Sequence, residues 1–171
     1  WYQEEGKAAV SLLYYNHLNT GRPLKEGKWF SKFTSNYLDI DNDPLYPFGY
    51  GLSYTTFKYG KPTLSSNTMT NNETISVSVD ITNTGNYDAD EIAQMYIRDL
   101  AASVSRPVKE LKGFERISIK KGETKTVTFT ITPEDLKFYN QELEYKNEPG
   151  EFEVMVGPNS KDVQTLTFTL K

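Results

Sequence analysis

Residues 75–82 alternate without exception between apolar and polar side chains. The apolar positions are Ile75, Val77, Val79 and Ile81. A period of two residues is that of a β-strand with one buried and one solvated face. The alternation returns at 127–131, 151–156 and 166–170, and two further segments, 91–98 and 111–119, are also interpreted as strands. Short strands separated by turns, with no long helical pattern between them, predict an all-β chain folded as an antiparallel β-sandwich.

The segment at 91–98 leaves open which side of its strand faces the core. The inward set is either Ile92, Gln94 and Tyr96 or Ala93, Met95 and Ile97. Leu64 and Phe138 mark candidates for further short strands. Thr132 followed by Pro133 predicts a one-turn helix, with the threonine as its cap and the proline at its first position.

The regular pattern begins at about Lys61 and predicts a division of the chain into two parts. Residues 61–171 are enough to bury a sandwich core without disulfides. Residues 1–60 are mostly irregular, and at most one short helix is predicted there, over 3–15. The segment 16–57 has turn signals but no sustained period, so we expect it to wrap around the surface of a partner domain.

An aromatic linker, Leu45–Phe57, joins these two parts. Tyr46 precedes a proline, which pushes its backbone toward extended geometry, and Gly49 and Gly51 permit positive φ or a close backbone approach. So many rings in a short span favour an extended, kinked connector that packs against a surface on either side. The residues with this predicted structural role are Tyr46, Pro47, Phe48, Gly49, Tyr50, Gly51, Leu52, Ser53, Tyr54 and Phe57.

The composition argues against several classes of function. The chain has no cysteine, so it can form no disulfide, thiol nucleophile or thiolate metal site. Its net charge is −4, and a mildly acidic chain without a basic face is not expected to bind nucleic acid or an anionic membrane. No run of residues in it is long and apolar enough to span a bilayer. We therefore predict neither a nucleic acid nor a membrane as partner.

The best candidate for a metal site is the acidic cluster of Asp39, Asp41 and Asp43. It has the opening spacing of a calcium-binding loop, which also requires Gly at its sixth position and Glu at its twelfth. Those positions hold Pro44 and Tyr50, so an EF-hand is not expected. A looser calcium site remains an alternative to the favoured interpretation, a solvated turn. No cofactor is predicted.

No catalytic residue is predicted in the chain either. His17 is its single histidine, and no Gly-x-Ser-x-Gly elbow surrounds any serine. A glycosidase requires two carboxylates that face each other across a cleft, whereas most acidic residues here fall in turns or on outward strand positions. A platform of aromatic side chains could stack on sugar rings, although packing against a missing domain is the favoured interpretation. Its members would be Trp1, Tyr14, Tyr15, Trp29, Tyr37 and Tyr50.

Several stretches of the sequence resemble one known family. The segment Pro44–Phe57 resembles the motif that joins the last two domains of glycoside hydrolase family 3 enzymes, the β-glucosidase and β-xylosidase family. The segments that resemble the part preceding this motif are Tyr14–His17, Asn19–Pro23 and Tyr37–Asp39. Those that resemble the family's C-terminal fibronectin type III-like domain are Val108–Arg116, Lys121–Thr124 and Pro149–Gly157. The resemblance implies an immunoglobulin/fibronectin type III-like sandwich over 61–171, after the tail of an α/β domain and the linker in 1–60.

The resemblance also implies what the chain lacks. In that family the nucleophile is an aspartate of an N-terminal barrel domain. The acid/base is usually a glutamate upstream of a segment that Trp1–Gly6 resembles, so both are expected before residue 1. The implied function is that of a non-catalytic accessory region, inactive alone, of a retaining enzyme that hydrolyses β-glucosides or β-xylosides at the non-reducing end.

Partners and location follow from the same resemblance. The expected partners are the N-terminal catalytic domains, and the implied location is periplasmic or secreted in a bacterium. Two alternatives stay open beside the accessory region. One is a carbohydrate-binding module that uses the aromatic side chains. The other is a protein-interaction or dimerisation module that self-associates through an exposed aromatic linker.

Overall fold

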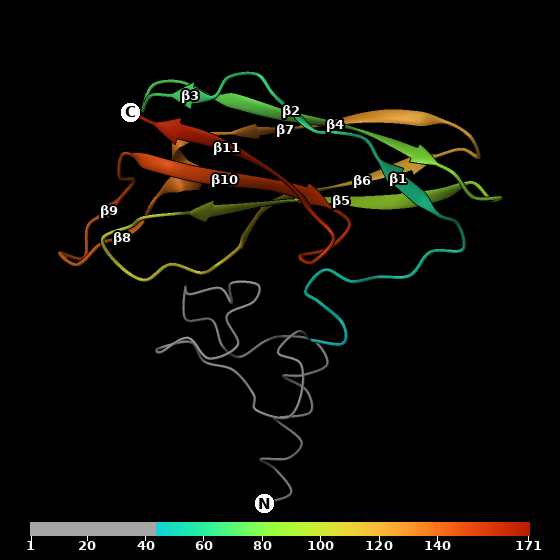
Figure 1. The fold of residues 1–171 in the computed structure, drawn as a ribbon, viewed down its shortest axis with the longest axis horizontal. Coiled ribbons are helices and arrows are strands. Elements are labelled where there is room, and N and C mark those ends of the chain that lie inside the picture. Colours follow the sequence, from blue (N-terminus) through green and yellow to red (C-terminus); the bar gives the residue numbers. More distant parts are fainter. Residues whose placement is uncertain (1–43) are drawn as a thin grey trace, which may run out of the picture.

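The computed structural model describes residues 44–171, which form two β-sheets packed face to face (Figure 1). The four-stranded first sheet comprises β1 (Phe57–Tyr59), β2 (Thr63–Leu64), β4 (Ile75–Asn83) and β7 (Thr124–Ile131). The five-stranded second sheet comprises β3 (Thr68–Met69), β5 (Ala89–Asp99), β6 (Glu110–Ile119), β10 (Gly150–Gly157) and β11 (Gln164–Leu170). A separate hairpin is made by β8 (Phe138–Tyr139) and β9 (Tyr145–Lys146). The predicted all-β sandwich is confirmed.

Strand pairing is antiparallel with one exception. β4 pairs with β7 along its length, from Ile75 opposite Ile131 to Thr82 opposite Thr124, and holds β1 and β2 on its other edge. The second sheet runs in the order β3-β11-β10-β5-β6. β3 and β11 run parallel, because the chain crosses from the first sheet to the second between β2 and β3 and arrives in the direction of β11. This contact of two residue pairs is the one parallel pairing among the described strands of the antiparallel sandwich.

One apolar core lies between the sheets. The alternating residues of β4, Ile75 to Ile81, are buried in it as predicted. Phe152 of β10 and Phe168 of β11 face them, and their rings stack with centroids 5.5 Å apart. Full burial of an aliphatic or aromatic side chain of this size contributes about 1.5–3 kcal/mol to folding. The period-two pattern of the sequence is therefore the pattern of the core.

The middle of β5 is buried on both faces. Ala93, Met95 and Ile97 belong to the core, which settles the alternative that the sequence left open. Gln94 and Tyr96 point to the opposite, outer face of the sheet and are buried as well. A strand covered on both sides shows a nearly continuous run of buried residues instead of an alternation. What covers the outer face of β5 is the linker.

The turns follow the predicted chemistry. Between β6 and β7 the chain reverses at Lys120–Glu123, where the amide of Glu123 donates to the carbonyl of Lys120 (2.9 Å) and Gly122 has φ +75°. The predicted one-turn helix is the 3₁₀ helix η1 (Pro133–Leu136). The carboxylate of Asp135 accepts the backbone amide of Thr132 (2.8 Å) and so satisfies a donor at the start of the turn.

Candidate functional site: the docked linker

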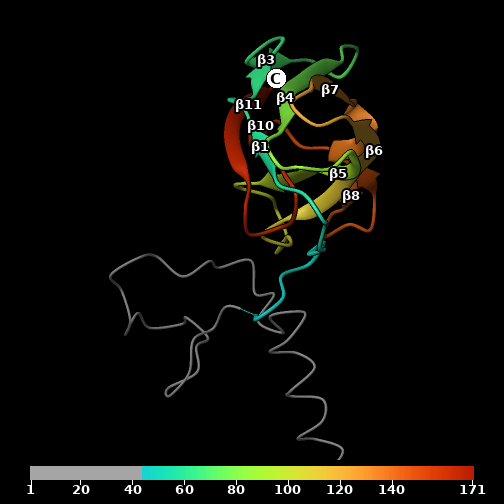
Figure 2. The same ribbon diagram turned by 90° about the vertical axis from the view of Figure 1, so that its right-hand side faces the viewer.

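The linker reaches the sandwich from the side of the second sheet and then passes to β1 in the first sheet (Figures 1 and 2). It is attached to the sandwich at two places, one on β5 and one at the end of β4. Phe57, the last residue of the linker, already belongs to β1 and packs against the core. The path of the linker is thus set by contacts with the chain's own sandwich.

Gln94 of β5 makes the first attachment. Its Nε2 donates to the carbonyl oxygens of Gly49 (3.0 Å) and Pro158 (2.6 Å). Its Oε1 accepts the hydroxyl hydrogen of Tyr96. A buried polar group left without a hydrogen-bond partner costs about 1–3 kcal/mol. Because moving the linker away would leave the buried amide of Gln94 without one of its partners, these hydrogen bonds hold the linker against β5 and the loop that follows β10.

Gly49 is required at this contact. Its φ is +78°, and a Cβ built on it would lie 2.0 Å from Oε1 of Gln94. A side chain at this position would therefore be strained in its backbone and would clash with the amide that anchors the linker. Gly51 differs, since a Cβ there would meet no atom within 4 Å. Of the two glycines singled out in the sequence, only Gly49 shows a positive φ and a close approach.

The residues beside Gly49 shape a compact arch. The amide of Tyr50 donates to the carbonyl of Pro47 (3.0 Å), and the amide of Ser160 donates to the carbonyl of Phe48 (2.9 Å). The ring of Phe48 meets Tyr96 edge-on, with centroids 6.4 Å apart. The rings of Tyr46 and Tyr50 lie 5.1 Å apart on the same arch. Aromatic pairs at these separations are attractive, so the arch has a defined shape.

Asn83 at the end of β4 makes the second attachment. Its Oδ1 accepts the hydroxyl of Thr55 (2.8 Å) and the amide of Gly85 (3.1 Å). Its Nδ2 donates to the carbonyls of Tyr87 (2.8 Å) and Ile119 (3.0 Å). One fully buried side chain therefore ties the linker to the turns at this end of the sandwich.

The outward side of the linker is apolar and solvent-exposed. Leu52 is 90% exposed and Tyr54 is 95% exposed. We call the exposed apolar side chains of this segment the linker face: Leu45, Tyr46, Phe48, Tyr50, Leu52 and Tyr54. We expected the rings of the linker to pack against a surface on either side. The ring of Phe48 packs on Tyr96 of the sandwich, whereas the side chain of Tyr54 extends into solvent.

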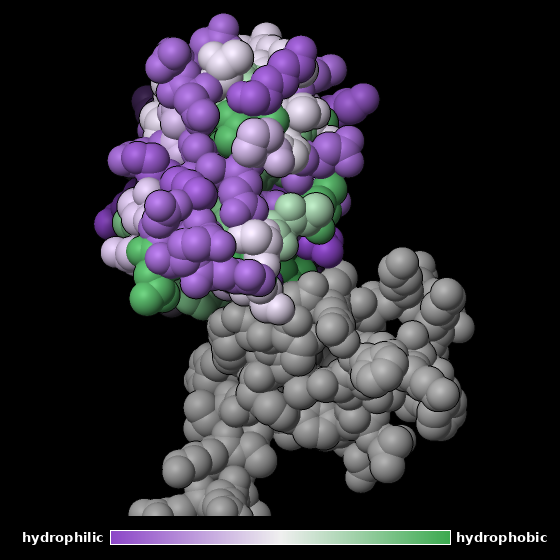
Figure 3. Space-filling model, turned by 90° about the vertical axis from the view of Figure 1, so that its left-hand side faces the viewer, coloured by the Kyte–Doolittle hydropathy of each residue, from purple (hydrophilic) through white to green (hydrophobic). Residues whose placement is uncertain are grey.

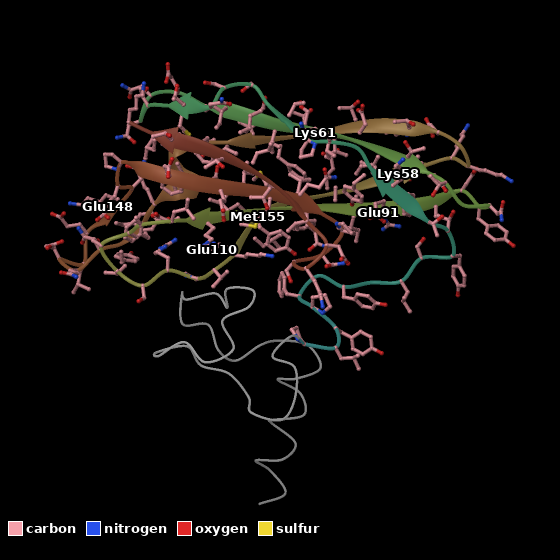
Figure 4. The ribbon with its side chains drawn as sticks, viewed as in Figure 1. Lys58, Lys61, Glu91, Glu110, Glu148 and Met155 are labelled. Carbon is pink, nitrogen blue, oxygen red and sulfur yellow. The ribbon has the colours of Figure 1, made fainter. Side chains whose placement is uncertain are left out.

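The outer face of the sheet beneath the linker carries both apolar and charged side chains, among them the Arg98–Glu153 ion pair. Met155 of β10 lies on the same side of the second sheet as the linker (Figure 4) and is buried. Further along this face Ile92 and Phe114 are exposed. The linker therefore covers only some of the apolar side chains on this face.

Two carboxyl groups of the described region have raised pKa values. Burial raises the pKa of Glu91, whose Oε1 accepts the hydroxyl of Tyr59 (2.8 Å). Burial, and to a lesser degree the nearby carboxylate, raises the pKa of Tyr59 in turn. Burial also raises the pKa of Asp99, which accepts the amide of Ala101 (3.1 Å). Both carboxyl groups are thus engaged in contacts that hold the fold.

An open pocket of about 320 Å³ lies in the loop after β5, lined by residues 98–107. The guanidinium of Arg106 lies 4.5 Å from the centroid of the Phe138 ring and pairs with Glu110. Its Nε is buried without a hydrogen-bond partner. Glu148 closes the loop by accepting both the amide (2.9 Å) and the hydroxyl (2.7 Å) of Ser103. These charged groups already have partners within the loop and the strands beside it.

The other sequence candidates lie mostly outside the described residues. These are the metal candidates Asp39, Asp41 and Asp43, together with His17 and the aromatic residues Trp1, Tyr14, Tyr15, Trp29 and Tyr37. Over residues 44–171 no cluster of three or more histidine or acidic side chains is placed to hold a metal ion. In the same part of the chain no helix is long and apolar enough to cross a membrane.

Sequence reasoning found the linker but not its anchors. Gln94 is separated from Gly49 by 45 residues, and Asn83 from Thr55 by 28. The one local signal for the first anchor is that Gln94 interrupts the apolar run from Ala93 to Ile97. The sequence did not show which face of this strand is buried.

The comparisons with known proteins fit this architecture. Residues 91–160 match the model of the fibronectin type III-like domain. The chain is 50% identical to the periplasmic beta-glucosidase of Salmonella typhimurium over 99% of its own length, and it spans 23% of that protein. It is 51% identical over 81% of its length to a putative beta-xylosidase of Formosa agariphila, of which it spans 18%.

Solved structures show the same relationship. A beta-glucosidase from Listeria innocua in complex with gluconolactone superimposes with a TM-score of 0.82 at 44% identity. That match covers 92% of this chain and 22% of the other. This chain corresponds to the C-terminal part of a glycoside hydrolase family 3 protein. The structure of the Bifidobacterium adolescentis GH3 beta-glucosidase superimposes on this chain with a TM-score of 0.67 at 36% identity, and the match covers 73% of this chain and 18% of the other.

Proposed function

We propose that this chain is a non-catalytic accessory region of a family 3 β-glycosidase, and that its linker face docks onto the catalytic domains of the same enzyme. The proposal rests on a contrast between two features of the linker, its fixed path and its exposed apolar side chains. Hydrogen bonds with the buried side chains of Gln94 and Asn83 hold the segment in one path, yet that path displays Leu52 and Tyr54 almost fully to solvent. A contiguous apolar patch of this kind on a small domain is typical of an interaction surface.

The length of the relatives supports a partner in the same polypeptide. The chain spans 18–23% of the Salmonella and Formosa proteins, so most of each relative lies outside the matched region. The parent reaction would then be the retaining hydrolysis of β-glucosides or β-xylosides from the non-reducing end, carried out by those other domains. In this assignment the aspartate nucleophile and glutamate acid/base belong to them, and the sandwich contributes a covering surface.

A chimera tests the docking directly. The matching C-terminal region of the Salmonella periplasmic beta-glucosidase is replaced by this chain, and the melting temperature and the hydrolysis of an aryl β-glucoside are measured. We expect a folded, active chimera in which Leu52→Ser and Tyr54→Ser lower the melting temperature. The same substitutions in the isolated 171-residue chain should leave its melting temperature unchanged within error, because both side chains are exposed there.

Tyr87→Ser is the matched control, since Tyr87 is 65% exposed but lies in the turn between β4 and β5. If the linker variants and this control behave alike in the chimera, the linker face does not dock. Hydrolysis of aryl β-glucoside or aryl β-xyloside by the isolated chain, lost on replacement of one Asp or Glu, would overturn the non-catalytic assignment. Concentration-dependent dimers of the isolated chain that the linker variants abolish would instead favour self-association.

A further inference from the structure

The hairpin Phe138–Lys146, which we call the tyrosine hairpin, displays a second group of exposed apolar side chains. Tyr139 of β8 lies directly opposite Tyr145 of β9, and their rings are 5.0 Å apart at an angle of 45°. Tyr139 is 65% exposed, Tyr145 is 53% exposed and Leu143 at the tip is 80% exposed. The end of the molecule seen in Figure 3 is mostly hydrophilic, with a few hydrophobic residues along its lower edge.

The hairpin is rigidly supported. Oδ1 of the buried Asn140 accepts the amides of Glu142 (3.1 Å) and Glu144 (2.9 Å), and the backbone of Asn140 pairs with Glu144 and Leu143. Below it, Phe138 is buried under the guanidinium of Arg106. The two tyrosine rings therefore project from a support that does not have to be ordered when a ligand arrives, which lowers the entropic cost of binding.

The tip of the hairpin carries a local cost. Leu143 has φ +61°, a conformation that costs a residue with a Cβ strain energy and that glycine or asparagine would adopt more easily. The residue in this position is instead a large apolar one that is mostly in water. The conformation belongs to the turn in which the amide of Leu143 donates to the carbonyl of Asn140 (3.1 Å). Leu143 therefore extends the apolar surface of the two tyrosines to the tip of the hairpin.

The chemistry around the rings suits a neutral sugar. Glu144 and Lys146 adjoin Tyr145 in the chain and therefore point to the opposite face of the hairpin, where they pair at 2.7 Å. The face with the two rings is left to apolar and stacking contacts. Glu142, Glu144 and Glu148 make the surroundings of the hairpin acidic, which disfavours anionic lipid or nucleic acid. Sugars with equatorial hydroxyls present an apolar C–H face that fits an exposed aromatic ring, and their hydroxyls remain in solvent.

The size of the patch favours a small ligand over a protein. A stable protein interface buries roughly 800 Å² on each partner, which is more than three side chains of a nine-residue hairpin supply. We propose that the tyrosine hairpin binds a short segment of a neutral, linear β-linked oligosaccharide by stacking on Tyr139 and Tyr145. This site is separate from the linker face and goes beyond the proposed accessory function. The competing explanation is a cross-strand aromatic pair that only stabilises the hairpin.

Isothermal titration of the full 171-residue chain with cellohexaose, laminarihexaose and xylohexaose tests the proposal. We expect measurable binding at millimolar ligand for at least one of the three. Tyr139→Ala and Tyr145→Ala should each weaken it by about tenfold, the loss expected when one aromatic stacking contact of about 1.4 kcal/mol is removed. Tyr139→Phe keeps the ring and should bind nearly as well as the wild type.

Tyr87→Ala is the matched control, since Tyr87 has the same 65% exposure as Tyr139 but lies elsewhere on the surface. Should an alanine variant fail to fold, NMR titration of the wild type reads the site directly through the amide signals of residues 138–146. No binding by any of the three sugars at millimolar concentration overturns the proposal. So does a loss of binding in Tyr87→Ala or in the linker variant Tyr54→Ser that equals the loss in Tyr139→Ala. Neither result affects the conclusion from the chimera experiment, because that experiment measures only the docking of the linker face.

Discussion

At the scale of single residues, Gly49 and Gly51 have different roles although both lie in the same aromatic motif. Gly49 combines φ +78° with a close contact to Gln94, whereas the position of a Cβ on Gly51 is open. We expect Gly49→Ala to reduce the free energy of unfolding by about 1–3 kcal/mol through backbone strain and loss of the Gln94 contact. Gly51→Ala should be neutral or slightly stabilising. Urea unfolding of both variants checks this, and equal stability would mean that the linker is not anchored at Gly49.

The pair of Glu91 and Tyr59 predicts a pH dependence of stability. Burial raises the pKa of Glu91 in the folded state above its ordinary value of 4.5, although the hydroxyl of Tyr59 opposes the shift. The folded state therefore binds the proton more tightly than the unfolded state. This contribution to stability is present at acid pH and is lost as pH rises through the folded pKa.

Glu91→Gln should accordingly raise the melting temperature at pH 7, because glutamine keeps an acceptor for Tyr59 without a buried charge. The gain over the wild type should shrink as pH falls toward 4. Thermal melts of both proteins across this range give the comparison. Glu115→Gln, at an exposed position of the neighbouring strand β6, shows the effect of removing one charge from the same sheet. A gain at Glu91→Gln that does not vary with pH would exclude this explanation.

At the scale of elements, the two phenylalanines of β6 and β7 separate core from surface. Phe129 of β7 belongs to the core, and Phe114 of β6 is exposed on the outer face of the second sheet. We expect Phe129→Ala to cost about 3–5 kcal/mol of stability, a large part of what a domain of this size has. Phe114→Ala should change stability by less than about 0.5 kcal/mol. Denaturant unfolding decides, and a Phe129→Ala variant as stable as the wild type would remove this residue from the core.

The sequence predicted the long strands, but it marked only Leu64 and Phe138 as candidates for short ones, and one physical reason explains both outcomes. β4 and β7 have one face in the core and one in solvent, so their residues carry a period of two. β2, β3, β8 and β9 have two residues each, too few to show any period. β5 shows no clear alternation at its centre because the linker buries its outer face. The pattern thus became ambiguous at the strand that carries the candidate site.

The candidate site could be predicted only in part. The linker was visible because its aromatic residues, proline and glycines are consecutive. Its anchors are single side chains, Gln94 and Asn83, whose contacts with the linker come from the tertiary fold. The only local signal was the polar amide within the apolar run from Ala93 to Ile97. The tyrosine hairpin was missed because Tyr139 and Tyr145 face the same side only after the chain has turned at Asn140.

At the scale of the whole molecule, the end of the linker continues into a strand of the sandwich. β1 adds Phe57, Lys58 and Tyr59 to the edge of the first sheet, opposite Ile81–Asn83. Phe57 and Tyr59 also pack against the core. A chain cut at the division predicted from the sequence, between residues 60 and 61, would lose this strand and the linker residues that Gln94 and Asn83 hold.

A truncation series tests where the domain begins. We expect residues 44–171 to melt cooperatively and residues 61–171 to melt about 10 °C lower. Losing two half-buried aromatic side chains costs roughly 2 kcal/mol, and each kcal/mol corresponds to several degrees in a domain of this size. A fragment of residues 55–171 keeps β1 and the hydroxyl of Thr55 that bonds to Asn83, but loses the contact of Gly49 with Gln94. It should therefore melt between the other two. Equal melting temperatures for 44–171 and 61–171 would place the boundary where the alternation of the sequence begins, and would show that the linker lies on a sandwich already complete without it.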